Sequence, residues 1–148
     1  MSVEDTLAVA GRLLGGKRVL KSELKSPQDV ISIVRRGLPY ASMVSLSEQL
    51  ETPVIEVSRI LGLVVRTLNR RKKSAKPLTE GESERLMRLA RVVARATEVL
   101  GDKATALRWM RAKNRALDGS PPISMMDVDV GAQLVEQLLG RIEYGVYG

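Results

Sequence analysis

Cysteine and histidine are both absent from the 148-residue sequence. Without cysteine no disulfide framework can form, which fits a reducing cytoplasm. The two absences also exclude a zinc site with Cys or His ligands, a cysteine nucleophile and a histidine general base. Catalysis would have to rely on carboxylates, Lys, Tyr, Ser and Arg. We therefore predict a non-enzymatic protein without a metal or a cofactor.

The sequence also lacks any apolar run long enough to span a membrane. Its first residues include Glu4 and Asp5, whereas a secretory signal peptide begins with basic residues. These features favour a cytoplasmic protein with no membrane partner. A chain of this length buries roughly 68–70% of its unfolded surface. Because 44% of its residues are hydrophobic, the chain can fold around a core of its own.

The net charge of +7 is unevenly distributed. Residues 114–148 contain two basic and five acidic residues, a net charge of −3, which leaves +10 for residues 1–113. Residues 57–79 contain seven basic residues and no acidic one. This asymmetry predicts two partners of different kinds, and nucleic acid is the first candidate for the basic segment.

Helix start and stop signals divide most of the chain. Residues 1–25 are assigned to an N-terminal arm, which either forms one short amphipathic helix ending at Gly15–Gly16 or is loosely held. Ser26 before Pro27 predicts a helix start, and Gly37 predicts its end. Helices are also expected after Pro39 and after Thr52–Pro53.

The second half begins at a capping box, Thr79-Glu80-Gly81-Glu82, which predicts a long helix to Leu100. Asp102 is expected to cap a further helix to about Ala112, and residues 114–122 are expected to form a loop. Asp127 is expected to cap a last helix with an apolar stripe of Val130, Leu134, Leu138 and Ile142. No segment alternates with period two, so the predicted fold class is all-α.

Two short predicted helices joined by a tight turn match a helix-turn-helix unit. Ser58 lets the helices approach, Gly62 supplies the left-handed turn, and Leu68 faces the core. The second helix spans about residues 64–71, and its basic side chains face outward. We predict DNA contacts, to base edges or to phosphates, from Val64, Val65, Arg66, Asn69, Arg70, Arg71, Lys72 and Lys73. The alternative is a helical hairpin with a solvated basic face, since Val64 replaces the usual Ser or Thr cap.

The C-terminal sequence contains a specific pattern: Ala106 to Met110, Asn114 to Gly119, Pro121, Gly131, Val135 and Leu139 to Tyr147. It resembles the toxin-binding domain of the Xre/MbcA/ParS antitoxins. The segments Gly37-Leu38-Pro39, Leu61-Gly62 and Arg66-Thr67-Leu68 resemble the Xre-type helix-turn-helix of the same antitoxins. The resemblance covers roughly residues 30–148. Lys76-Pro77 is the clearest boundary in the sequence, and we predict a helix-turn-helix domain, residues 26–78, and a toxin-binding and dimerisation domain, residues 79–148.

The resemblance implies that the partner is a RES-domain toxin that degrades NAD. It also implies a dimeric antitoxin whose C-terminal end covers the entrance to the toxin's active site, and whose helix-turn-helix binds operator DNA. The implied toxin-binding residues are Trp109, Asn114, Arg141, Tyr144, Val146 and Tyr147.

Three of these residues have simpler interpretations. Trp109 is interpreted as a core residue first, Asn114 as a helix C-cap, and Arg141 as an ion-pair partner of Glu136 or Glu143. The tyrosines are the better interface candidates, because tyrosine is enriched at binding hot spots. The competing hypothesis for the whole chain is a stand-alone transcriptional regulator whose C-terminal half only dimerises. An enzyme that uses carboxylates is a weaker third hypothesis.

Overall fold

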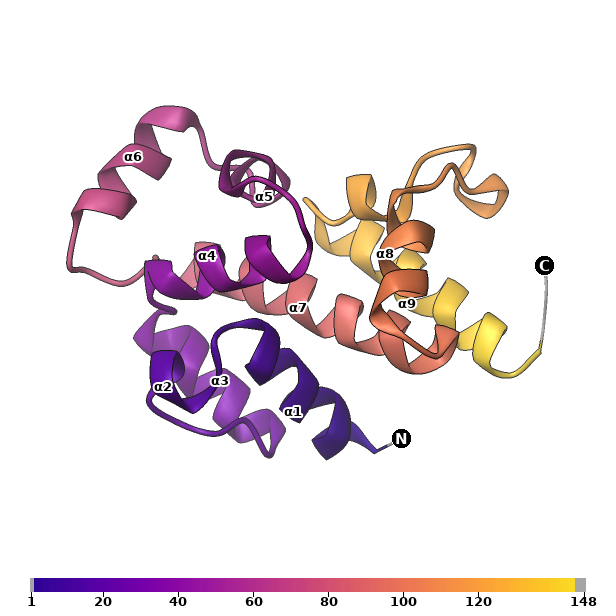
Figure 1. The fold of residues 1–148 in the computed structure, drawn as a ribbon, viewed down its shortest axis with the longest axis horizontal. Coiled ribbons are helices and arrows are strands. Elements are labelled where there is room, and N and C mark those ends of the chain that lie inside the picture. Colours follow the sequence, from indigo (N-terminus) through magenta and orange to yellow (C-terminus); the bar gives the residue numbers. More distant parts are fainter. Residues whose placement is uncertain (1, 146–148) are drawn as a thin grey trace.

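The computed structural model describes residues 2–145, which fold as helices with short connections and contain no strand (Figure 1). This confirms the predicted all-α class. The α-helices are α1 (Val3–Leu13), α2 (Gly16–Leu20), α3 (Pro27–Arg36), α4 (Tyr40–Gln49), α5 (Val54–Ile60), α6 (Val65–Lys73), α7 (Glu80–Leu100), α8 (Lys103–Arg111) and α9 (Asp129–Glu143). Two short 3-10 helices, η1 (Arg115–Leu117) and η2 (Pro122–Met125), connect α8 to α9. No helix within residues 2–145 is long and apolar enough to cross a membrane.

Helix α7 is the central helix on which α1, α3, α8 and α9 pack. Its apolar stripe faces the core, because Leu86, Leu89, Val93 and Ala96 are all fully buried. Helices α1 and α3 contact α7 on one side, and α8 and α9 contact it near its C-terminal end (Figure 1). The capping box at Thr79 forms as predicted and starts this helix. One long helix thus joins the two halves of the chain.

The N-terminal segment differs from a loosely held arm. Helices α1 and α2 bury Leu7, Leu14 and Leu20 in the common core. Thr6 also donates its hydroxyl to the carboxylate of Glu98 on α7, at 3.1 Å to each oxygen. The amphipathic spacing of residues 7–14 indicated a helix here, but the surface that receives it comes from α7, some 90 residues later. Residues 2–25 therefore pack as part of the helical body.

Two residues predicted to cap helices in the C-terminal half, Asn114 and Asp127, do not cap the helices expected of them. Helix α8 ends at Arg111 with Ala112 as its C-cap, and Asn114 instead caps η1 by accepting a hydrogen bond from the Ala116 amide at 3.0 Å. The residue that precedes α9 is Val128, so Asp127 is not its cap. The connection between α8 and α9 contains η1 and η2. The end of α8 and the start of α9 therefore lie within one or two residues of their predicted positions.

The apolar stripe expected on α9 is only half buried. Leu138 is buried and Ile142 is partly buried, but Val130 and Leu134 remain 66% and 40% exposed. The buried face instead contains Gly131, Ala132, Val135, Leu138 and Leu139. The reason is the close approach of η2, since a Cβ at Gly131 would overlap the carbonyl oxygen of Met125. Gly131 therefore faces η2 at this contact, and Val130 and Leu134 face outward.

Candidate functional site

The turn between α5 and α6 has the geometry of a helix-turn-helix. Gly62 has φ +74° and closes a Schellman motif, in which the amide of Leu63 donates to the carbonyl of Ser58 at 2.8 Å. The Ser58 side chain is buried, and its hydroxyl donates to the carbonyl of Ile55 at 2.7 Å. Leu68 is buried beneath α6. The small, glycine and apolar positions therefore act as the sequence predicts.

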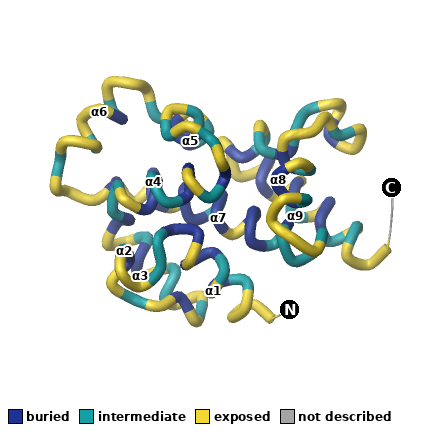
Figure 2. Tube along the Cα trace, in the orientation of Figure 1, coloured by how far each residue is buried: buried dark blue, intermediate teal, exposed yellow. Residues whose placement is uncertain are grey.

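Most residues of α6 are exposed (Figure 2). Val64 and Val65 are 64% and 54% exposed at its N-terminal end. The other exposed positions among the predicted DNA contacts are Arg66, Asn69, Arg70, Lys72 and Lys73. Among residues 2–145, no carboxylate lies within ion-pair distance of these cations. The arrangement can bind a polyanion and leaves Arg66, Asn69 and Arg70 available to base edges.

Arg71 has a different role from the predicted phosphate contact. Its guanidinium forms a two-pronged ion pair with Glu82, with Nε–Oε1 and Nη2–Oε2 distances of 2.9 and 3.3 Å. Both side chains are largely buried, at 18% and 7% exposure. Helix α6 packs mainly on α5, and this ion pair adds a link from α6 to α7. Arg71 is therefore a positioning residue that fixes α6 relative to α7.

Glu82 serves the ion pair and the helix cap at once. Its carboxylate accepts a hydrogen bond from the Thr79 amide at 2.9 Å, and its own amide donates to the Thr79 hydroxyl. Burial raises the pKa of Glu82, but the hydrogen bonds from Arg71 and Thr79 outweigh burial and leave this pKa below its ordinary value. The ion pair in turn raises the pKa of Arg71. Glu82 therefore remains ionised at neutral pH.

A second exposed surface runs along α9 to its C-terminal end. Val130, Leu134, Arg141 and Tyr144 are exposed and recur at helical spacing on one side of the helix. Tyr144 is 80% exposed. Among residues 2–145 no ion pair to Arg141 forms, which differs from the pairing with Glu136 or Glu143 considered above. This combination of apolar, aromatic and arginine side chains is typical of a protein-binding surface.

The remaining predicted toxin contacts are divided between the core and the surface. Trp109 is partly buried against the core, as its simpler interpretation predicts. Asn114 is partly exposed, and its side chain is used by the η1 cap. Val146 and Tyr147 lie outside the described residues. The structure therefore places Arg141 and Tyr144 on one side of α9 and its C-terminal end, whereas Trp109 lies on α8 and Asn114 directly before η1.

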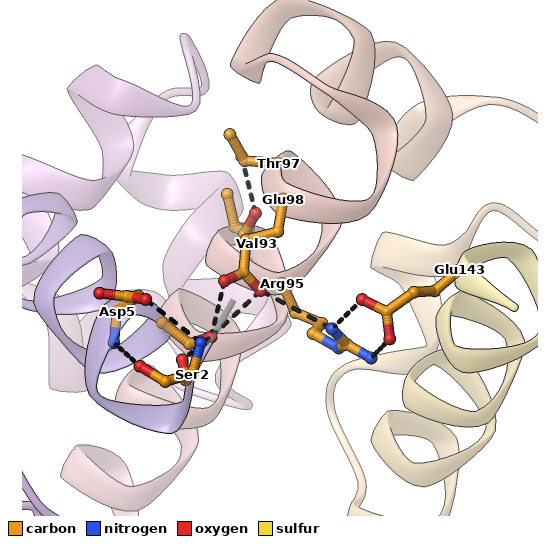
Figure 3. A network of polar contacts seen from close by, with 8 residues as sticks. Ser2, Asp5, Val93, Arg95, Thr97, Glu98 and Glu143 are labelled. Carbon is orange, nitrogen blue, oxygen red and sulfur yellow. Dashed lines mark hydrogen bonds and ion pairs between the residues drawn. The ribbon is translucent and has the colours of Figure 1, made fainter.

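A polar network fixes the end of α9 to α7 (Figure 3). Arg95 on α7 forms two 2.8 Å hydrogen bonds to the carboxylate of Glu143, the last residue of α9. Arg95 also lies 3.7 Å from the buried carboxylate of Glu98. The hydrogen bonds from Arg95 lower the pKa of Glu143. Neither this pair nor Arg71–Glu82 was found from the sequence, because their partners are 48 and 11 residues apart and follow no repeat.

The fold and these surfaces define a class: a helical protein in which a helix-turn-helix is followed by a helical unit with an exposed protein-binding end. Two family models match the chain. Residues 29–91 match the antitoxin Xre-like helix-turn-helix domain, and residues 95–145 match the antitoxin Xre/MbcA/ParS C-terminal toxin-binding domain.

Curated relatives agree with both matches. The chain is 34% identical to an antitoxin Xre of Photorhabdus laumondii over 116 residues, which is 78% of each chain. It is 31% identical to an antitoxin Xre of Yersinia enterocolitica over 119 residues, or 80% of each chain. A more distant relative, the Prs ADP-ribosylating antitoxin of a Sphingobium species, is 24% identical over 82% of each chain.

The chain belongs to the Xre/MbcA/ParS family of antitoxins. It is accordingly an antitoxin of a toxin–antitoxin system, with a helix-turn-helix domain and a C-terminal toxin-binding domain. The two matched segments meet within α7. The division after residue 78 stays a prediction.

Proposed function

We propose that this antitoxin neutralises a RES-domain toxin that degrades NAD, and that the segment from Tyr144 onward covers the entrance to the toxin's active site. One observation carries the proposal. Within the match to the toxin-binding domain, α9 is followed by Tyr144, which is 80% exposed and directly follows Glu143, the residue that Arg95 holds on α7. The name of the Sphingobium relative adds support, because ADP-ribosylation is a reaction that consumes NAD.

Removal of residues 144–148 tests this proposal. The truncated chain retains every helix and the Arg95–Glu143 pair, so it should fold and bind DNA as the full chain does. We expect its inhibition of the cognate toxin to fall at least about hundredfold, since interface tyrosines concentrate binding energy. The measurement is NAD loss by purified toxin, titrated with full-length or truncated antitoxin. Full protection by the truncated chain contradicts the proposal.

For the helix-turn-helix domain, we propose that α6 enters the major groove of an operator and that the antitoxin represses its own operon as a dimer. The absence of acidic residues over residues 57–79 and the exposure of Arg66 and Arg70 support this assignment. In this proposal the chain has no catalytic activity, no metal and no cofactor. The antitoxin would then act on the toxin and on the promoter only by binding to them.

A stand-alone transcriptional regulator is the second candidate, because α6 carries the DNA-binding features without help from α9. Recovery of the tagged chain from its native host separates the two candidates. A small partner in stoichiometric amount that consumes NAD only after the antitoxin is removed supports the antitoxin mechanism. Recovery of promoter DNA without such a partner favours the regulator.

A further inference from the structure

A groove of about 530 Å³ lies between the N-terminal helices and the end of α9, at the opposite end of the molecule from α6 (Figure 1). One wall comes from α1 and α3, and the other comes from α7 and α9. Its lining includes Val3, Val30 and Ile31 on the first wall and Arg91, Glu136 and Tyr144 on the second.

The walls of this groove are tied together by the polar network of Figure 3. Thr6 donates its hydroxyl to both carboxylate oxygens of Glu98, which holds α1 on α7. The two 2.8 Å hydrogen bonds between Arg95 and Glu143 hold the end of α9 on the same helix. A groove with fixed walls needs little rearrangement on binding, which reduces the entropic cost of filling it.

The groove has an apolar wall opposite a polar wall that contains two arginines, of which Arg95 is paired with Glu143. Val3 and Ile31 are 63% and 48% exposed, although both are large apolar side chains. Arg91 is exposed, and no carboxylate within residues 2–145 lies at ion-pair distance from it. The chemistry that fits is an apolar protein segment carrying an acidic residue that faces Arg91.

The position of the groove identifies its occupant. The wall formed by Arg95, Glu143 and Tyr144 lies within the match to the toxin-binding domain, while α1 lies outside both family matches. Tyr144 also begins the segment proposed to cover the toxin's active site. We infer that the toxin fills this groove with such an acidic–apolar segment, and that α1 and α3 extend the toxin-binding surface beyond the C-terminal domain. This inference rests on the proposed neutralisation of a toxin.

Charge introduced on the apolar wall tests the inference. Ile31→Asp and Val3→Asp should each weaken inhibition of the purified cognate toxin about tenfold, by burying an unpaired carboxylate against an apolar segment. Ile55→Asp is the matched control, because Ile55 is a similarly exposed apolar residue on α5, away from the groove. Thermal melts by circular dichroism establish that all three variants fold.

The role of Arg91 is tested in the same toxin-inhibition assay. Arg91→Glu should weaken inhibition about tenfold, because it sets two acidic groups against each other. Arg12→Glu is its control, since Arg12 is an exposed arginine on the N-terminal helices that does not line this groove. Equal loss in both arginine variants would indicate a general charge effect and would overturn the inference.

The outcomes separate this inference from the proposed function. Unchanged inhibition by the groove variants, together with loss of inhibition on truncation after residue 143, overturns the inference alone. Failure of the full-length chain to inhibit the toxin overturns both. Loss of self-association by Ile31→Asp in light scattering, with toxin inhibition retained, assigns the groove to a second copy of this chain and also overturns the inference.

Discussion

Helices α6 and α9 both expose apolar and charged side chains, but their charge and their attachment differ. The segment around α6 contains no acidic residue, whereas α9 contains Asp129, Glu136 and Glu143 beside a single arginine. Helix α6 lies at the edge of the molecule and packs on α5, whereas α9 packs along α7 and η2 (Figure 1). A surface of one sign suits the uniform charge of DNA, and a mixed surface suits the varied surface of a protein. The comparison assigns one partner to each end of the molecule.

The largest effect is expected from a change that disturbs α9 alone. Gly131→Ala places a Cβ against the backbone carbonyl of Met125, so we expect a loss of about 3 kcal/mol in the free energy of unfolding and weaker toxin inhibition. Gly140→Ala is the control, because Gly140 has open space and alanine favours the helix. Urea unfolding measures both. Equal stability of the two variants would show that η2 moves aside without cost.

Removal of two arginines from α6 should weaken the binding of operator DNA and leave toxin inhibition unchanged. Arg66→Ala combined with Arg70→Ala should weaken operator binding about hundredfold, since each good base or phosphate contact contributes roughly 1–3 kcal/mol. The slope of log affinity against log salt should also flatten by up to about 2. Arg115→Ala, on η1, is the control for loss of charge elsewhere. A salt slope equal to that of the parent protein would mean that these arginines do not face DNA.

A smaller effect is expected where α6 is attached to α7. Arg71→Ala removes both hydrogen bonds to the buried Glu82 carboxylate and should lower the free energy of unfolding by about 2 kcal/mol. DNA affinity should fall because α6 loses a tether, but the salt slope should stay unchanged because Arg71 does not reach phosphate. Fluorescence anisotropy at several salt concentrations measures this. A flattened slope would return Arg71 to the DNA surface.

The smallest effect is a pH dependence of stability at Glu82. Its folded-state pKa lies below the ordinary value of 4.5, so the stabilisation is present at neutral pH and is lost as pH falls from about 4.5 through the folded-state pKa. At pH 7, Glu82→Gln should lower the free energy of unfolding by about 1 kcal/mol, and the variant should therefore unfold at a lower temperature than the parent protein. The two melting temperatures should converge toward pH 3. A constant difference across that range would contradict the ion-pair explanation.

Local signals in the sequence predicted the helices well, because capping and turn formation depend on neighbouring residues. The helix start at Ser26, the capping box at Thr79 and the turn at Gly62 all form where their residues indicate. The face of α9 was harder to predict, since burial there depends on how closely η2 approaches Gly131. For the candidate sites, exposure of Arg66 and Arg70 follows from helical spacing around the buried Leu68. The partners of Arg71 and Arg95 follow from no local pattern.

The sequence by itself determined the class of fold, the helix-turn-helix and the family, because these depend on periodicity, caps and short motifs that neighbouring residues encode. The tertiary structure decided which charged residues remain available to partners. It withdrew Arg71 into an ion pair with Glu82, left Arg91 exposed and turned Val130 outward. It also placed α1 beside the end of α9, so that a groove forms from segments more than 100 residues apart. These outcomes depend on long-range packing against α7, which no local signal specifies.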